Sequence, residues 1–108
     1  IAPAVTKAIA YIDENYMKQP GLESISKAAG VSSQHLCRLF RQTLNCRPME
    51  YITKRKIQAA KMLLAETQKT VEQIAEETGF CDSSYFCKIF KRFESITPSQ
   101  FRSIEQAL

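Results

Sequence analysis

The chain has 108 residues, of which 44% are hydrophobic and 24% are charged, and its formal net charge at pH 7 is +4. A chain of this length and composition forms one small globular domain, or two very small ones that share a core. A membrane-spanning protein is excluded, because no apolar run approaches the roughly 20 residues that a spanning helix needs.

Almost the whole chain is predicted to be helical, because apolar residues recur at spacings of three and four residues. The sustained alternation of apolar and polar residues that is typical of a strand does not occur. A first helix is expected near 4–17, and Pro20 and Gly21 end it. No basic leader precedes this helix, so no signal peptide is expected. Because the first residue is isoleucine, we expect the chain to be a fragment or a processed form.

A short helix is predicted near 22–29, with Gly30 in a position that suits a left-handed C-cap. Ser32 is a good N-cap for a third helix near 33–44. Pro48 then opens a long helix near 48–65, because proline is tolerated in the first turn. The apolar residues of this long helix cover a wide arc, so it is expected to pack against both halves of the chain.

The second half repeats this plan. A short helix near 71–78 is stopped by Gly79, and Asp82 is the expected N-cap of a helix near 83–94. A Thr-Pro pair then opens a last helix near 98–106.

The same helical unit therefore occurs twice, in residues 25–52 and 74–102. Equivalent residues of the two copies lie 49 positions apart up to Gly30 and Gly79, and 50 positions apart after them. The second copy therefore has one extra turn residue, near Cys81. Identical pairs at these offsets include Ile25/Ile74, Gly30/Gly79, Cys37/Cys87, Phe40/Phe90 and Pro48/Pro98. Only two copies are present, so the chain is a tandem pair and not a solenoid.

Basic residues are concentrated in segments 31–56 and 83–93. These segments hold nine of the 15 basic residues and one acidic residue, Glu50. Charge segregated in this way predicts a positive face, and a positive face suggests binding to phosphate.

The second helix of each copy has the pattern of a DNA-recognition helix. Such a helix needs an apolar face toward its scaffold and a polar or basic face toward the major groove. The predicted inward residues are Leu36, Leu39 and Phe40 in the first copy, and Phe86, Ile89, Phe90 and Phe93 in the second. The predicted outer stripes are Gln34, Cys37, Arg38 and Arg41, and then Ser84, Cys87, Lys88 and Lys91.

These residues resemble the DNA-binding domain of AraC/XylS-type bacterial transcription regulators over essentially the full chain. The resemblance rests on VSSQHLCRLFR in the first copy and on IAEETGFCDSSYFCKIFKRFESITPSQFR in the second. It implies an all-α fold of seven helices, in which two helix-turn-helix subdomains are joined by a long central helix. The corresponding boundaries are 1–47 and 67–108 for the two subdomains and 48–66 for the bridging helix.

The resemblance also implies a set of DNA contacts in successive major grooves. Base contacts would be made by Gln34, Cys37 and Arg38 in the first copy and by Ser83, Ser84, Cys87 and Lys88 in the second. Backbone contacts would be made by Arg41, Arg55, Lys91 and Thr97. For Arg55 a structural ion pair within its helix is the alternative.

The chain departs from the family pattern at two kinds of position. Asn45 and Ser95 stand where members often have glycine, three residues before each proline, which affects the C-cap geometry. The second departure is a cysteine at equivalent positions of the two outer stripes, Cys37 and Cys87. A thiol is a poor hydrogen-bond donor. We therefore expect apolar contact there, for example with a thymine methyl group.

The remaining cysteines and aromatic residues are given structural roles. The four cysteines include no C-x-x-C pair and no metal-ligand spacing to His35, so free thiols are predicted, with a zinc site or redox pair as the alternatives. His35 is predicted to be a partly buried packing residue. The aromatic residues predicted to lie in the core are Phe80, Tyr85, Phe86, Phe90, Phe93 and Phe101.

The sequence thus predicts sequence-specific double-stranded DNA binding by a transcription regulator, most simply an activator. No cofactor is expected, and no catalytic motif points to an enzyme. Contact with RNA polymerase is compatible with this function, and a sensor or dimerisation domain is expected outside this chain. The expected location is the cytoplasm, at the nucleoid. The alternative is a helical protein-protein interaction module without DNA specificity.

Overall fold

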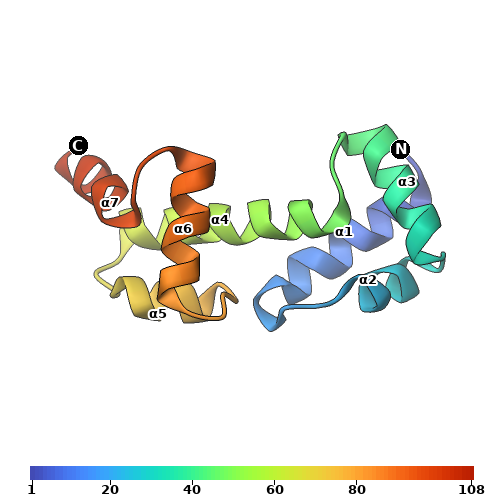
Figure 1. Ribbon diagram of the computed structural model, residues 1–108, viewed down its shortest axis with the longest axis horizontal. Coiled ribbons are helices and arrows are strands. Elements are labelled where there is room, and N and C mark those ends of the chain that lie inside the picture. Colours follow the sequence, from blue (N-terminus) through green and yellow to red (C-terminus); the bar gives the residue numbers. More distant parts are fainter. The chain divides into compact units, whose positions relative to one another are not determined.

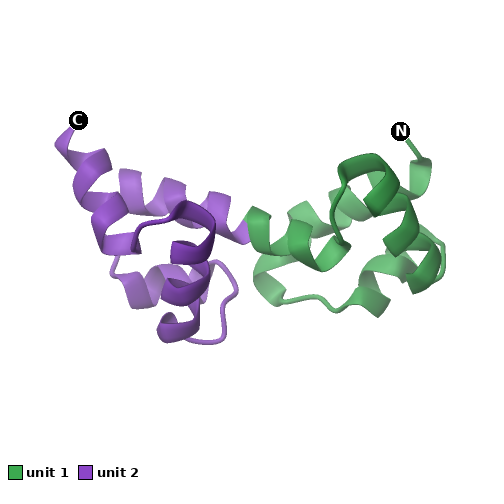
Figure 2. Ribbon diagram, turned by 45° about the horizontal axis from the view of Figure 1, so that its top comes forward, with its two compact units in different colours: residues 1–55 green, residues 56–108 purple.

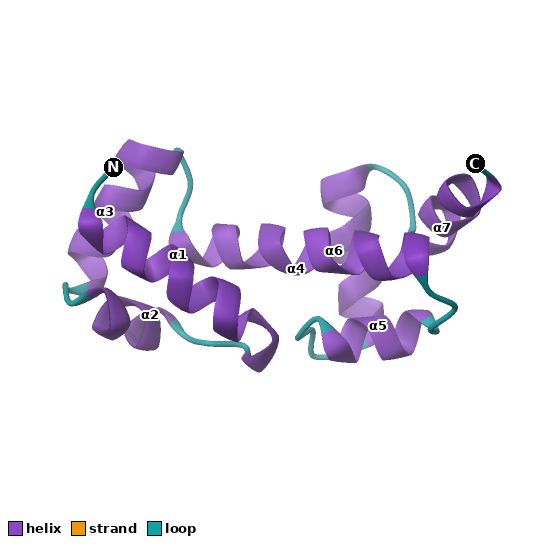
Figure 3. Cartoon of the chain, turned by 180° about the vertical axis from the view of Figure 1, so that it is seen from behind, coloured by secondary structure: helices purple, strands orange, loops and turns teal.

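The computed structural model describes residues 1–108 and is built from seven α-helices and one 3-10 helix, without strands (Figures 1 and 3). The elements are α1 (Pro3–Asn15), η1 (Tyr16–Lys18), α2 (Leu22–Ala29), α3 (Ser33–Leu44), α4 (Pro48–Glu66), α5 (Val71–Glu77), α6 (Ser83–Glu94) and α7 (Pro98–Ala107). The expected all-α fold with seven helices is confirmed. The one difference in kind is η1, the short 3-10 turn that finishes the helix predicted near 4–17.

The predicted N-caps form the expected hydrogen bonds. The Ser32 side chain accepts a hydrogen bond from the backbone N–H of His35 at 3.1 Å, and Asp82 Oδ1 accepts from Tyr85 at 2.7 Å. Each such cap stabilises its helix by about 1 kcal/mol. These bonds fix the first residues of α3 and α6, the two predicted recognition helices.

The C-terminal ends of α3 and α6 adopt the left-handed conformation that glycine usually supplies. Asn45 has φ +56° and Ser95 has φ +70°, and their backbone N–H groups donate to the carbonyls of Arg41 and Lys91. The two departures from the family pattern therefore preserve the same cap. Asparagine adopts this conformation more readily than serine, so the strain is greater at Ser95.

The chain divides into two compact units, Ile1–Arg55 and Lys56–Leu108 (Figure 2). The boundary lies within α4, which is one continuous helix and belongs to both units. The three-part division with a separate bridging helix at 48–66 stays a prediction. The core of the first unit contains Val5, Ala8, Ile12, Ile25, Ala29, Leu36, Phe40 and Ile52. The core of the second contains Ile57, Ala60, Leu64, Ile74, Ala75, Phe80, Phe86, Ile89 and Phe90.

The two units repeat their aromatic packing. Phe40 meets Tyr51 edge to face, with ring centroids 5.9 Å apart and an angle of 73°. At the equivalent positions, Phe90 meets Phe101 at 5.6 Å and the same angle. These contacts attach each recognition helix to the helix that follows it.

The structural repeat begins earlier in the chain than the sequence similarity. Buried residues on α1 recur 52 positions later on the second half of α4, in the pairs Val5/Ile57, Ala8/Ala60 and Ile12/Leu64. The end of each segment repeats as well: Asn15 Nδ2 donates to the Tyr11 carbonyl, and Thr67 Oγ1 donates to the Leu63 carbonyl. Each unit is therefore a supporting helix, a helix-turn-helix and a closing helix, and α4 is the closing helix of one and the supporting helix of the other.

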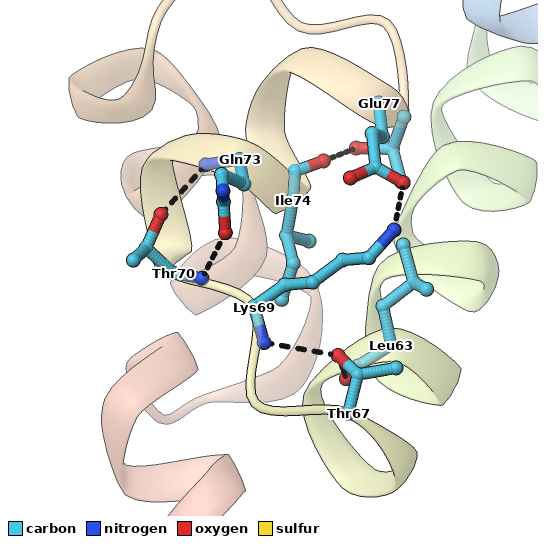
Figure 4. Close-up of polar contacts among 8 residues, drawn as sticks. Leu63, Thr67, Lys69, Thr70, Gln73, Ile74 and Glu77 are labelled. Atoms are coloured by element: carbon cyan, nitrogen blue, oxygen red, sulfur yellow. Dashed lines mark hydrogen bonds and ion pairs between the residues drawn. The ribbon is translucent and has the colours of Figure 1, made fainter.

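The connector between α4 and α5 is fixed by a series of polar contacts (Figure 4). Thr67 Oγ1 accepts from the Lys69 backbone N–H at 3.3 Å, and Lys69 Nζ lies 2.7 Å from a Glu77 carboxylate oxygen. Thr70 and Gln73 form a reciprocal capping box that starts α5. These contacts tie α5 to the end of α4 within the second unit.

The closing helix α7 also caps α4. Arg102 Nε and Gln106 Nε2 donate to the Leu64 carbonyl at 3.2 and 3.0 Å, and both side chains reach the Thr67 carbonyl. A cation at a helix C-terminus also interacts favourably with the helix dipole. The arginine that ends the T-P-x-x-F-R motif is therefore a structural residue.

We predict that Phe90→Ala lowers the free energy of unfolding by about 3–5 kcal/mol, because it leaves a cavity in the second core. Phe93→Ala, on the same helix, is the matched control and should cost less than about 1.5 kcal/mol, because Phe93 is 38% exposed. Urea denaturation followed by circular dichroism measures both. Equal costs would show that α6 does not pack in the orientation described.

Candidate nucleic-acid interface

The outer face of α3 is polar and basic. Gln34, Arg38 and Arg41 are exposed, as predicted, whereas Leu36 and Phe40 are fully buried. Cys37, the fourth member of the predicted stripe, is only partly exposed. The solvent-facing stripe is therefore centred on Gln34 and Arg38.

The outer face of α6 has the same arrangement. Ser84, Lys88 and Lys91 are exposed, at the positions equivalent to Gln34, Arg38 and Arg41. We call these two sets of three residues the α3 stripe and the α6 stripe. Equivalent residues of the two units thus present equivalent charges on their recognition helices.

Cys87 was expected on the outer stripe but is half-buried against the second core. Burial raises the pKa of its thiol, and the nearby negative charge of Glu72 raises it further. The thiol form of Cys87 is therefore favoured over the thiolate. Cys37 lies at the same edge of α3 and is also partly buried.

Further exposed residues, which were not predicted from the sequence, lie on the opposite flank of both stripes. His35 was expected to be partly buried and Tyr85 to lie in the core, but both are exposed, Tyr85 to 50%. His35 directly follows Gln34, and Tyr85 directly follows Ser84. Each therefore lies about 100° further around its helix than the stripe residue before it, which is still outside the buried arc. Gln42 and Arg92 are exposed on the same flank.

Phe93 was also wrongly placed in the core. Its spacing from Ile89 and Phe90 suggested burial, but it lies near the end of α6 and is 38% exposed. The repeat contained the signal, because the equivalent residue of the first copy is Thr43, a polar residue that is exposed.

A shallow groove lies at the turn of each helix-turn-helix. Turn groove 1 is lined by Glu23, Ser24, Ser26, Lys27, Val31, Ser32 and Ser33. Turn groove 2 is lined by Glu72, Ala75, Glu76, Phe80, Cys81, Asp82 and Ser83. Ser83, a predicted base contact, is partly exposed and lines turn groove 2.

Two of the predicted backbone contacts have partners within the protein. Arg55 Nε lies 3.1 Å from an Asp13 carboxylate oxygen, and its guanidinium lies 4.7 Å from the Tyr16 ring centroid. The ion pair joins α4 to α1 and is therefore not the within-helix pair considered from the sequence. Thr97 is partly buried and its hydroxyl accepts from the Gln100 N–H, so it acts as the cap of α7. Contact of either residue with DNA stays a prediction.

Lys56 was counted in the basic segments but is turned into the second unit. Its ammonium donates to the Gly79 carbonyl at 2.8 Å and lies 5.2 Å from the Phe80 ring centroid. Burial lowers the pKa of this amine, although the nearby Cys81 opposes the shift. Lys56 therefore holds the turn of the second helix-turn-helix, and the exposed positive charge is smaller than the sequence suggests.

The sequence matches the family described as "Helix-turn-helix domain" over residues 25–104. It is 31% identical over 98 residues to the lactose operon transcription activator of Staphylococcus xylosus, a match that covers 91% of this chain and 35% of the relative. The fold is similar to the crystal structure of an AraC-type DNA-binding domain-containing regulator from Chromobacterium violaceum, with TM-score 0.91, 29% identity, and coverage of 95% and 92% of the two chains.

This chain belongs to the AraC-type helix-turn-helix family. The DNA-binding domain of AdpA, solved in complex with a target DNA, has the same fold at TM-score 0.91 and 21% identity, over 98% of this chain and 96% of that one. The family and the fold are those of DNA-binding transcription regulators and not of enzymes. The AraC-type domain described here binds DNA as part of a bacterial transcription regulator. It spans about a third of the length of the curated relatives that it matches.

No group of three or more potential metal ligands occurs in the structure, and the cysteines form no disulfide. None of the helices is both long enough and apolar enough to cross a bilayer.

We predict that Cys87 reacts with iodoacetamide at pH 8 at least about fivefold more slowly than the exposed Cys81, because the raised pKa lowers its thiolate fraction and burial limits access. Mass spectrometry of digested samples gives the rate at each cysteine. In urea the two rates should converge. A native Cys87 that reacted faster than Cys81 would contradict the buried position.

Proposed function

We propose that this AraC-type domain recognises a specific operator by placing α3 and α6 in successive major grooves of double-stranded DNA. The observation that carries the proposal is the equivalence of the two stripes. Arg38 and Lys88 occupy the same position on the two recognition helices, as do Arg41 and Lys91, and all four are exposed. A protein that bound DNA through a single recognition helix would not need basic residues at equivalent positions of both helices.

The proposed base contacts are made from the first half of each recognition helix. Arg38 is suited to guanine, because a guanidinium donates two hydrogen bonds to O6 and N7. Lys88 donates as a point charge, and the amide of Gln34 and the hydroxyls of Ser83 and Ser84 can donate or accept. Cys37 and Cys87 lie at the stripe edge and would contribute apolar contacts, such as those to thymine methyl groups.

Phosphate contacts would supply most of the affinity. Arg41 and Lys91 lie one turn further from the N-terminus of each recognition helix and would contact the backbone, with Thr97 and Arg55 as further candidates. With roughly six to eight contacts, log K should fall against log salt with a slope of about −5 to −7. Two major-groove faces one turn apart are roughly 34 Å apart, so the site would cover about two turns.

The role of the whole regulator follows from its relatives and is part of the proposal. The lactose operon transcription activator suggests an activator, and contact with RNA polymerase agrees with that role. Because the chain spans about a third of such relatives, a sensor or dimerisation domain would occupy the remainder of the protein. We place the regulator in the cytoplasm, at the nucleoid, and assign it no enzymatic activity.

The proposal is tested by comparing an operator, selected from a random DNA library, with random DNA in a gel-shift titration. Arg38→Ala should weaken operator binding by about 1–3 kcal/mol and relax the preference at one base pair. Lys91→Ala should weaken both DNAs alike and make the salt slope less steep by about 1.

Two results would contradict the proposal. Equal losses on operator and random DNA for Arg38→Ala would remove its base-reading role. A wild-type salt slope near zero would remove the electrostatic mechanism.

A further inference from the structure

The two units carry different net charges although their folds repeat. The first unit contains eight basic and four acidic residues, whereas the second contains seven of each. The whole formal charge of +4 therefore belongs to the first unit. Two copies that bound phosphate equally would need similar charges.

The difference is concentrated around the turn of the helix-turn-helix. The repeat places Lys27 of α2 opposite Glu76 of α5, and Ser32 opposite Asp82. All four residues line the turn grooves, and Lys27 and Glu76 are both exposed. Turn groove 1 is lined by one acidic and one basic residue, and turn groove 2 by three acidic residues.

These charges lie where they affect DNA binding. In a helix-turn-helix the first helix crosses the DNA backbone while the second enters the major groove. Glu76 shares turn groove 2 with Ser83, a predicted base contact, and the charge of Glu72 is felt at Cys87 on α6. Neither Glu72 nor Glu76 forms an ion pair in the structure. Both negative charges would therefore oppose an approaching phosphate.

We infer that the first unit is the electrostatic anchor on duplex DNA and that the acidic turn groove 2 weakens the second unit, which engages DNA because it is tethered to the first. This inference rests on the proposed function. Tethering makes the second contact intramolecular, so a weak unit still adds to the total affinity. The attraction of the second unit to phosphate should be the first to be lost as salt increases.

The test exchanges the charges at the equivalent positions in the complete 108-residue chain. Glu76→Lys should tighten operator binding by roughly five- to tenfold at low salt and make the salt slope steeper by about 1, because a repulsive charge becomes a phosphate contact. Lys27→Glu should weaken binding by a similar factor. Glu105→Lys is the matched control: it makes the same charge change at an exposed residue of α7 outside the turn groove.

Hydroxyl-radical footprinting shows which unit is affected. Each unit is expected to protect one half of the operator, which we call its half-site. The half-site that loses protection in Arg38→Ala is the α3 half-site, and the one that loses protection in Lys88→Ala is the α6 half-site. In the wild-type chain the α3 half-site should stay protected at higher salt than the α6 half-site. In Glu76→Lys the α6 half-site should stay protected up to the same salt concentration as the α3 half-site. Thermal unfolding checks that each variant is folded.

The inference is overturned if both wild-type half-sites lose protection at the same salt concentration, or if Glu105→Lys tightens binding as much as Glu76→Lys. It is also overturned if Glu76→Lys leaves the α6 half-site unchanged. These results would leave the proposed function intact, since the operator would still be bound. A wild-type chain that protected no duplex would refute the proposed function and the inference with it.

Discussion

The burial of one phenylalanine on each recognition helix determines which residues the helix presents to solvent. Phe40 and Phe90 are fully buried, and each is locked edge to face against an aromatic ring of the following helix. An α-helix has only one rotation that buries such a residue, so the face on the other side of the axis must point outward. The α3 and α6 stripes are exposed because these rings are buried, and the proposed DNA recognition depends on that orientation.

The helix boundaries could be predicted closely because local chemistry sets them. The ranges 33–44 and 83–94 agree with α3 and α6, since Ser32 and Asp82 supply the caps at one end and Asn45 and Ser95 turn the chain at the other. These signals depend on a few neighbouring residues, so a single sequence contains them. The helical period also indicated the exposed residues of the two stripes, although it placed Cys37 and Cys87 among them.

The errors occur where burial depends on neighbouring elements. Cys87 and Phe93 lie at the edges of the buried arc of α6, and only the packing of the unit shows that the thiol is partly covered while the ring is exposed. The sequence also could not indicate that Arg55 has Asp13 as a partner, because Asp13 lies 42 positions away on α1. Contact of Arg55 with DNA stays a prediction. The repeat itself indicates that Phe93 is exposed, because its counterpart in the first copy is the polar residue Thr43.

The duplicated architecture separates what folds the units from what distinguishes them. The pairs that stabilise both copies, such as Phe40/Phe90 and Tyr51/Phe101, remain aromatic, whereas the exposed pair Lys27/Glu76 has opposite charges. Exposed residues change charge at little cost to stability, while buried rings do not change size freely. Two units of one design can therefore differ in how strongly they hold DNA.

Whether the two stripes meet DNA is measured most directly by an NMR titration of the ¹⁵N-labelled chain with its selected operator. The largest amide shifts should fall on the α3 and α6 stripes, around Arg38 and Lys88, while exposed residues of α1 such as Lys7 change little. Large shifts confined to α1 or to the C-terminal end of α7, with both stripes unperturbed, would show that the stripes do not bind DNA.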